Sequence, residues 1–137
     1  MNITLWVLQV LLAVAFFAHG WLFFFPPPDI AALMNAALPR WFQLFLGTAE
    51  VLAAIGLTLP GVTRILPQMV PLAAAGIMIV MVSATIYHVI RDEISSAVIT
   101  FVLLIMATFV AYMRYRVLPI AARGSKPASP ALRPTGS

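Results

Sequence analysis

The stretch that decides the fold is Trp41-Phe-Gln-Leu-Phe-Leu-Gly-Thr-Ala-Glu50-Val-Leu-Ala-Ala-Ile-Gly-Leu-Thr-Leu59. Its length and its apolar side chains suit a transmembrane helix, which needs about 20 residues to cross about 30 Å of hydrocarbon. Glu50 stands near the middle of this stretch. A carboxylate at that depth costs several kcal/mol unless it is protonated, paired or hydrated. We therefore expect Glu50 to face a helix bundle or a water-filled cavity rather than lipid.

The composition of the chain indicates an integral membrane protein. Hydrophobic residues make up 63% of the 137 residues and charged residues 9%, and the mean hydropathy is +1.04. Charged residues are about 25% of an ordinary soluble domain, and a soluble chain of this length could not bury so much apolar surface in one small core. The sequence has no cysteine, which excludes disulfides, thiolate metal sites and thiol redox chemistry by this chain.

Apolar windows of about 20 residues predict an all-α fold of four transmembrane helices. The predicted spans are approximately 3–25, 41–59, 67–90 and 95–113. Pro60-Gly61 is expected to end the second span, and Arg91-Asp92-Glu93 the third. The first span lacks a cationic start and an Ala-x-Ala cleavage site, which favours a retained helix over a signal peptide.

A short amphipathic helix is expected at the membrane surface between the first two spans. Pro26-Pro27-Pro28 cannot continue the first helix, because proline lacks an N–H and its ring clashes with the preceding turn. Asp29 follows at an N-cap position. The apolar residues that follow at helical spacing are Ile30, Leu33, Met34, Ala37 and Leu38. The alternative is an irregular apolar loop.

The end of the chain differs in composition from the rest. Residues 119–137 are rich in proline, alanine, serine and basic residues, and they show no apolar periodicity. Such a segment has too little to bury to offset chain entropy. We therefore predict a transmembrane domain over residues 1–118, followed by a disordered basic tail over residues 119–137.

The distribution of lysine and arginine predicts that both termini are cytoplasmic. The basic residues expected on one side of the membrane are Arg64, Arg114, Arg116, Arg123, Lys126 and Arg133. The loops on the other side carry only Arg40 and Arg91, together with three acidic residues. This bias follows the positive-inside rule. The net charge of +4 is therefore a topology signal, and nucleic acid is not expected as a partner.

Three titratable side chains are expected in the outer half of the bilayer. At about 1.5 Å per residue, Glu50 lies about 13 Å below the outer interface and His19 about 9 Å below it. His88 lies at the outer boundary, near the end of the third span. The three residues belong to three helices, which can converge in a compact bundle. We take Glu50, His19 and His88 as the candidate catalytic residues.

Neighbouring residues extend this candidate site. Gln43 and Gly47 share one helical face with Glu50, and the small residue would let a helix or a ligand approach the carboxylate. Thr85 shares a face with His88, and Trp21 lies close to His19 in the sequence. The candidate ligand-binding residues are Gln43, Gly47, Trp21, Thr85 and Arg91.

Each candidate also has a structural interpretation. Glu50 could be a neutral link between helices, although such intramembrane hydrogen bonds average only about 0.6 kcal/mol. His19 could satisfy a backbone carbonyl, His88 could be solvated at the boundary, and Arg91-Asp92-Glu93 could be a solvated turn. Metal binding by the two histidines and Glu50 is weaker, because no helical His-x-x-x-His or Glu-x-x-His pair supports it. No metal site is predicted.

Several stretches of the sequence resemble a known family. They are Met1–Val10, Leu46–Pro60, Pro71–Gly76 and the end of the third span, where His88 is followed by Arg91 and Glu93. In these stretches, over residues 1 to about 118, the chain resembles the DoxX-like membrane proteins. Many of those relatives carry a lysine after the glycine of the first helix, where this chain has Trp21 after Gly20.

The resemblance implies a four-helix protein of the bacterial cytoplasmic (inner) membrane. The family name derives from subunits of a thiosulfate:quinone oxidoreductase, and most members have no assigned activity. The resemblance thus supports the bundle and leaves the chemistry of the candidate site open.

Two classes of function remain. In the first, a lipid-accessible pocket at Glu50, His19 and His88 binds a hydrophobic small molecule such as a quinone or an isoprenoid-type lipid. Acid–base chemistry on that molecule, or a role as a quinone-linked oxidoreductase subunit, would be feasible. No cofactor is expected within the chain itself, because no haem motif or flavin fold is visible. In the second, the protein is a non-catalytic accessory or scaffold subunit of a membrane or redox complex. Either class is compatible with a homo-oligomer.

Overall fold

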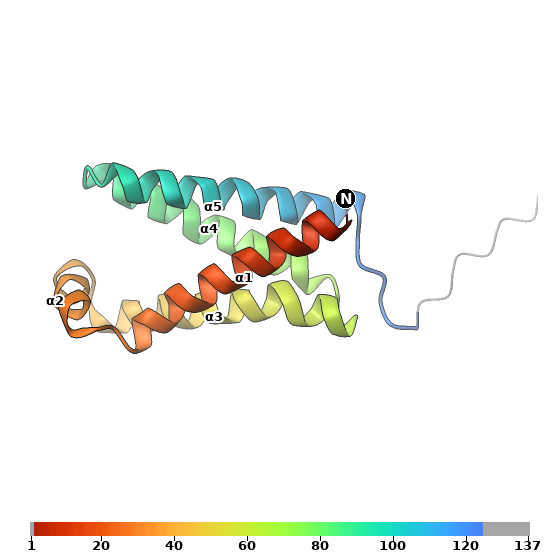
Figure 1. The fold of residues 1–137 in the computed structure, drawn as a ribbon, viewed down its shortest axis with the longest axis horizontal. Helices are drawn as coiled ribbons and strands as arrows, with labels where there is room; N and C mark the ends of the chain where they lie inside the picture. The colour runs from red at the N-terminus through yellow and green to blue at the C-terminus, as the bar shows by residue number, and fades with distance from the viewer. Residues whose placement is uncertain (1, 125–137) are drawn as a thin grey trace, which may run out of the picture.

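The computed structural model describes residues 2–124 of the chain, which contain helices and connections but no strand. Four long helices run the length of the molecule (Figure 1): α1 (Asn2–Phe24), α3 (Arg40–Thr63), α4 (Met69–Ile90) and α5 (Ile94–Tyr112). The short helix α2 (Pro28–Ala37) connects α1 to α3, and a π-helical turn, η1 (Met113–Val117), extends α5. The predicted all-α fold with four transmembrane helices is confirmed.

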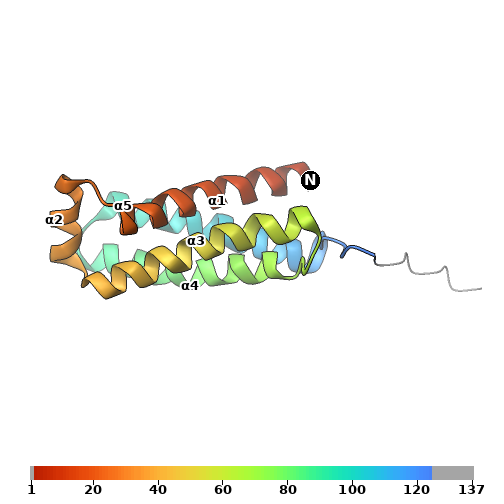
Figure 2. The same cartoon turned by 90° about the horizontal axis from the view of Figure 1, so that it is seen from below.

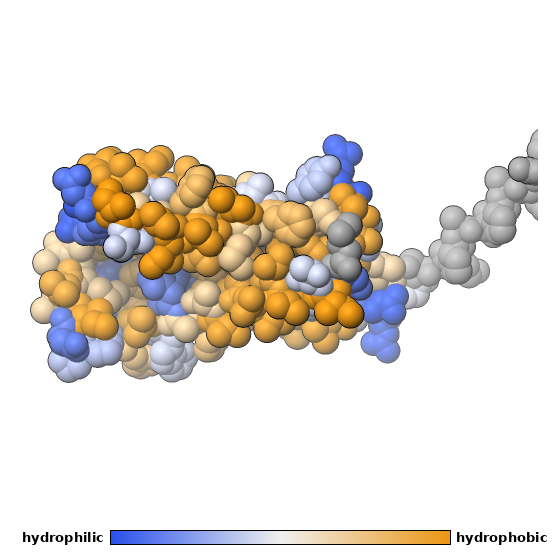
Figure 3. All heavy atoms as spheres, turned by 45° about the horizontal axis from the view of Figure 1, so that its top comes forward, coloured by the Kyte–Doolittle hydropathy of each residue, from blue (hydrophilic) through white to orange (hydrophobic). Residues whose placement is uncertain are grey.

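The outer surface of the bundle is apolar. Each long helix, with α5 continuing to Val117, is long and apolar enough to cross a membrane. In Figure 3 apolar side chains cover the flank of the molecule, and hydrophilic residues gather mainly towards its two ends. Ile79, for example, is 72% exposed. An apolar surface that covers the flank of a protein would favour association in water, whereas in a bilayer it contacts lipid. The chain is therefore a multi-pass membrane protein.

The four long helices form two pairs. α1 packs along α3 and α4 packs along α5, while α3 also packs against α4. α1 crosses the molecule at an angle, so that it contacts α5 and η1 near the N-terminus (Figure 1). α2 lies across one end of the bundle (Figure 2). We call this the α2 end, and we call the opposite end, which carries the N-terminus and η1, the arginine end.

The contact between α1 and α3 depends on two glycines. A Cβ added to Gly20 would lie 2.9 Å from the carbonyl oxygen of Gly47 and 3.1 Å from the Cβ of Glu50. A Cβ added to Gly47 would lie 2.8 Å from the Cβ of Phe23. Glycine therefore lets the two backbones approach closely, as small residues do at helix contacts in membranes.

Two details of the helix ends differ from the sequence prediction. Pro60 does not end the second transmembrane helix, because α3 continues through it to Thr63. Neighbouring helices and small local adjustments make proline tolerable inside a membrane helix. Asp29 is not the N-cap of α2, since Pro27 occupies that position and Pro28 is the first helical residue. Asp29 lies in the first turn, where a negatively charged carboxylate interacts favourably with the positive end of the helix dipole.

The start of the predicted tail lies against the bundle. The backbone N–H of Arg123 donates to the carbonyl of Arg64 at 2.9 Å, and Nε of Arg64 donates to the carbonyl of Ala121 at 3.1 Å. The segment Pro119–Gly124 therefore lies beside the end of α3 in space. Residues 125–137, on which most of the predicted disorder falls, lie outside the described residues.

Replacing Gly47 by alanine should destabilise the bundle by about 1–3 kcal/mol, the usual effect of overpacking. Gly76 on α4 is the matched control, because an added Cβ there would meet no atom within 4 Å. Gly76→Ala should leave stability unchanged or raise it by about 0.5–1 kcal/mol, since alanine loses less backbone entropy in a helix. Thermal and denaturant unfolding of both variants in detergent measures the difference. Equal effects of the two substitutions would contradict the packing described for α1 and α3.

Candidate functional site

The approach of α1 to α3 brings His19 and Glu50 together. Nδ1 of His19 lies 2.7 Å from Oε2 of Glu50. Glu50 is buried with only 3% of its surface exposed, whereas the His19 side chain is 60% exposed. His19 precedes Gly20 in the chain, and the missing side chain at Gly20 makes room for the Cβ of Glu50. The helix contact and the polar pair therefore depend on each other.

The pair can hold one proton in two ways. With the proton on Nδ1, the ring of His19 donates to the carboxylate, and with the proton on Oε2, Glu50 donates to the ring. The edge-to-face contact of His19 with Phe23, at a ring-centre distance of 5.1 Å, fixes the ring orientation. Nε2 of His19 has no hydrogen bond within residues 2–124 and stays available to another molecule. The arrangement can thus exchange a proton between a buried acid and an exposed base.

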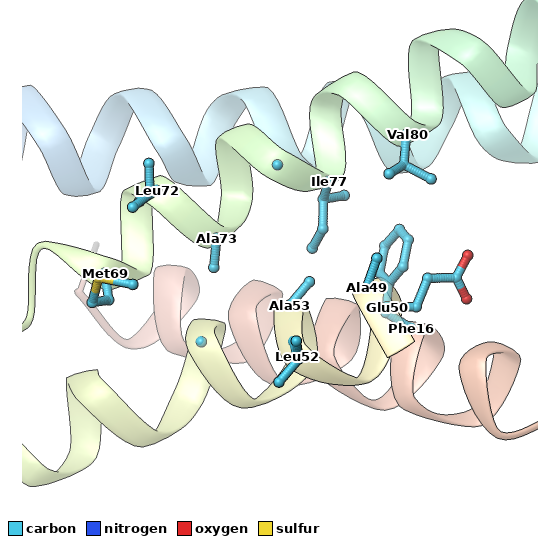
Figure 4. A pocket seen from close by; sticks show the side chains of 12 residues that line it. Phe16, Ala49, Glu50, Leu52, Ala53, Met69, Leu72, Ala73, Ile77 and Val80 are labelled. Atoms are coloured by element: carbon cyan, nitrogen blue, oxygen red, sulfur yellow. The ribbon is translucent and has the colours of Figure 1, made fainter. Parts of the chain in front are cut away.

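An apolar cavity of about 260 Å³ lies beside this pair, between α3 and α4. Its walls come from α1, α3 and α4 (Figure 4): Phe16, Ala49, Glu50, Leu52, Ala53, Gly56, Met69, Leu72, Ala73, Gly76, Ile77 and Val80. The carboxylate of Glu50 lies at one end of the cavity and points away from the end formed by Met69 and Leu72 (Figure 4). The cavity therefore combines a long apolar wall with one polar end.

The cavity reaches the outer, apolar surface of the bundle. Leu52 and Leu72 line it and are themselves 61% and 60% exposed. Two glycines shape its interior. Gly56 allows a close contact with Ala73, because an added Cβ would lie 2.8 Å from the Cβ of that alanine, whereas Gly76 faces open space. A molecule dissolved in the bilayer could therefore reach the cavity from the side.

His88 and Arg91 form a separate cluster at the turn between α4 and α5. Nδ1 of His88 lies 2.6 Å from Oε2 of Glu93, and Nε of Arg91 donates to Oε1 of the same carboxylate at 2.9 Å. The ring of Tyr87 lies 5.3 Å below the guanidinium of Arg91. The structure thus brings His19 and Glu50 together and pairs His88 with Glu93 instead. The convergence of the three candidate residues that we expected from depth alone is not found.

The other candidate ligand-binding residues contact helices and do not line the cavity. The amide of Gln43 donates to the carbonyl of Leu38 at 2.8 Å and to Oδ1 of Asn35 at 3.1 Å, which fixes the end of α2 to α3. Thr85 lies 2.9 Å from Oγ1 of Thr100 and so connects α4 to α5. Trp21 is half exposed and contacts Phe17 of its own helix and Phe25 just beyond the end of that helix. Gly47 serves the contact with α1.

Most of the cavity wall cannot be predicted from the sequence. Ala53 and Ile77 are examples, because apolar residues in a transmembrane helix do not stand out from their surroundings. Small residues three or four positions apart do give a signal. Ala49, Ala53 and Gly56 lie at such spacing on α3, and small-residue spacing of this kind is typical of close helix contacts.

The fold and the site together define a small four-helix membrane protein with an acid–histidine pair inside the bundle. The chain belongs to the DoxX-like family, because a model of that family matches residues 7–110. The match includes His19, Glu50 and nearly all of the four long helices. Comparison with curated proteins and with solved structures gave no match. The resemblance noted in the sequence is thereby confirmed.

The contact of His19 with Glu50 should be measurable as a coupling energy between α1 and α3. In a double-mutant cycle of His19→Ala and Glu50→Ala, we expect a coupling of about 1–2 kcal/mol. This exceeds the average of about 0.6 kcal/mol for intramembrane hydrogen bonds, because a charge-assisted bond is stronger. Unfolding in detergent gives the four stabilities. His19→Ala combined with Thr85→Ala is the control and should be additive, and a coupling as small as that of the control would refute the pairing.

The cluster at the α4–α5 turn should make stability depend on pH. Arg91 and, to a lesser extent, His88 lower the pKa of Glu93 below its ordinary value. Glu93 therefore stabilises the fold above its unfolded pKa of about 4.3, and this contribution is lost as the pH falls through the lower folded pKa. Glu93→Gln should be less stable than the wild type at pH 7, and the difference should be smaller at pH 3. Unfolding midpoints at both pH values test this, and a difference as large in acid as at pH 7 would contradict it.

Proposed function

We propose that the protein binds a lipophilic small molecule in the cavity between α3 and α4, with the His19–Glu50 pair as its polar contact. A quinone or an isoprenoid-type lipid fits this description. The observation that carries the proposal is a buried carboxylate, hydrogen-bonded to a histidine, at the end of an apolar cavity that reaches the lipid-facing surface.

The size of the cavity limits what it would hold. Ligand pockets in proteins commonly measure about 300–1,000 Å³, and the volume here is about 260 Å³. A single ring, or a few isoprene units, would occupy it, and a longer tail would remain in the bilayer beside Leu52 and Leu72. This favours lateral binding from the membrane over binding from water.

The polar pair would orient the ligand and supply a proton. Glu50 lines the cavity and His19 does not, so a carbonyl oxygen of the ligand would accept a hydrogen bond from the protonated carboxyl group of Glu50. If that proton moves to the ligand, the carboxylate of Glu50 remains and would accept a hydrogen bond from Nδ1–H of the neutral His19 ring. Reduction of a quinone would also need two electrons, which a redox partner subunit would have to supply.

The charges at the two ends support a cytoplasmic location for both termini. Arg64, Arg114, Arg116 and Arg123 lie at the arginine end. The α2 end and the α4–α5 turn carry the basic residues Arg40 and Arg91 and the acidic residues Asp29, Asp92 and Glu93. By the positive-inside rule, the arginine end would face the cytoplasm of a bacterial cell. Glu50 and His19 would then lie towards the outer side.

Filling the cavity should abolish binding without disturbing the fold. Gly76→Leu would place its side chain in the open space beside Gly76, while Gly76→Ala leaves most of that space. After purification in mild detergent, mass spectrometry of co-purified lipids and quinones should find a bound apolar molecule in the wild type and in Gly76→Ala. Its amount should fall at least tenfold in Gly76→Leu.

Glu50→Gln keeps the size of the side chain and removes the acid. We expect this variant to bind a short-tailed ubiquinone used as a probe roughly 5- to 30-fold more weakly, as the loss of about 1–2 kcal/mol implies. Unchanged lipid content in Gly76→Leu, together with a stoichiometric protein partner, would overturn the proposal. The protein would then be an accessory or scaffold subunit.

A further inference from the structure

The arginine end contains a buried cation that no carboxylate within residues 2–124 neutralises. Arg114 is 3% exposed, although it lies in η1 at the end of a transmembrane segment. Its Nε donates to Oε1 of Gln9 at 2.6 Å, and its Nη1 donates to Oδ1 of Asn2 at 2.8 Å. Its Nη2 is buried and has no hydrogen-bond partner within residues 2–124. All of these partners are neutral groups.

The sequence provides no carboxylate side chain for this end. The chain has four acidic residues, and none of them follows Glu93. Glu50 is bonded to His19, and Asp29 lies in α2. Asp92 and Glu93 lie at the turn between α4 and α5, away from η1. A buried charge without a counter-ion costs several kcal/mol, so an anion from outside the chain would be strongly favoured here.

A cavity of about 370 Å³ adjoins Arg114. Its walls are Asn2, Trp6, Gly61, Arg64, Arg114, Leu118, Pro119, Ile120 and Ala121. Two arginines from different elements therefore line one space. Within residues 2–124, neither guanidinium has a carboxylate at ion-pair distance.

The local structure holds both arginines in place. The ring of Trp6 lies 5.3 Å below the guanidinium of Arg114, and Gln9 is itself fixed by donating to the carbonyl of Leu57 at 2.7 Å. Arg64 has a left-handed backbone (φ 59°), which is uncommon for residues other than glycine, and its Nε donates to the carbonyl of Ala121. Gly61 leaves room beside Trp6, because an added Cβ would lie 2.8 Å from that ring. The site is built before any ligand binds.

We propose that this cavity binds the phosphate group of an anionic membrane lipid. Two guanidinium groups match the oxygens of a phosphate, and their positive charge favours a lipid of net negative charge over a zwitterionic lipid whose own cation offsets its phosphate. The cavity lies where α1 begins and α3 ends, so in a spanning bundle it is at the depth of the lipid headgroups. Phosphate groups are concentrated at that depth, and basic pockets between transmembrane helices are known to hold anionic headgroups.

A bound phosphate would join elements that are distant in the sequence. Arg64 follows α3, Arg114 belongs to η1, and the segment Leu118–Ala121 lines the space between them. The anion would compensate the buried charge of Arg114 and so stabilise the contact of η1 with α1. This inference does not depend on the cavity between α3 and α4.

The test uses the full chain in detergent micelles that contain either phosphatidylglycerol or phosphatidylcholine. Phosphatidylglycerol should raise the unfolding temperature of the wild type and appear as a bound lipid in native mass spectra, whereas phosphatidylcholine should not. Arg114→Gln should weaken binding at least tenfold, and Arg64→Gln several-fold. Arg116→Gln is the matched control, because Arg116 is exposed, lies two residues from Arg114 and does not line the cavity. It should bind as the wild type does.

Three results would overturn the proposal. The first is equal stabilisation by the two lipids. The second is an equal loss in Arg116→Gln and Arg114→Gln, which would indicate diffuse surface charge. The third is a shift with inorganic phosphate as large as that with phosphatidylglycerol, which would assign the site to free phosphate. Arg64 is exposed, so Arg64→Gln keeps the test decisive if Arg114→Gln fails to fold.

Discussion

Gly20 and Gly47 let the backbones of α1 and α3 approach so closely that a Cβ added to either glycine would lie 2.9 Å from the carbonyl oxygen of the other. Lipid is as apolar as the helices, so close packing and hydrogen bonds supply much of the attraction between helices in a membrane. The same approach sets Nδ1 of His19 2.7 Å from Glu50. That bond compensates a carboxylate which would otherwise be costly inside the bilayer. Packing and acid–base chemistry therefore arise from one helix contact.

The rest of the bundle shows a division between polar and apolar contacts. Gln43 fixes α2 to α3, His19 meets Glu50 halfway along, and Gln9 connects α1 to the carbonyl of Leu57 and to Arg114. The contact of α3 with α4 is different, since small residues such as Gly56 and Ala73 meet there while open space remains at Gly76. A lipophilic molecule would most easily enter at this less tightly filled contact.

Hydropathy predicts the four spans because each helix must satisfy its own backbone in lipid, and the inward direction of Glu50 follows from its charge. The depth of His88 in the membrane does not predict its partner, because depth does not define the rotation of the helix about its axis. Glu93, only five residues away in the turn that follows, is the residue that His88 contacts. The sequence predicts a helix end at Pro60, because the packing against neighbouring helices that makes a proline tolerable inside α3 cannot be read from the sequence. The sequence indicates only a topology role for Arg114, because its burial depends on Gln9, which lies 105 residues away in the chain.

The two polar clusters along the bundle differ in how their charge is balanced. In the His19–Glu50 pair the acid and the base lie side by side, so transfer of the bridging proton between Nδ1 and Oε2 leaves the net charge of the pair unchanged. Arg114 has only neutral partners within residues 2–124, so an anion bound beside it would compensate its charge. We therefore expect the first cluster to accept a ligand reversibly and the second to hold its lipid continuously. Because Gln9 touches both Leu57 of α3 and Arg114 of η1, a lipid at the arginine end would steady the helix that carries Glu50.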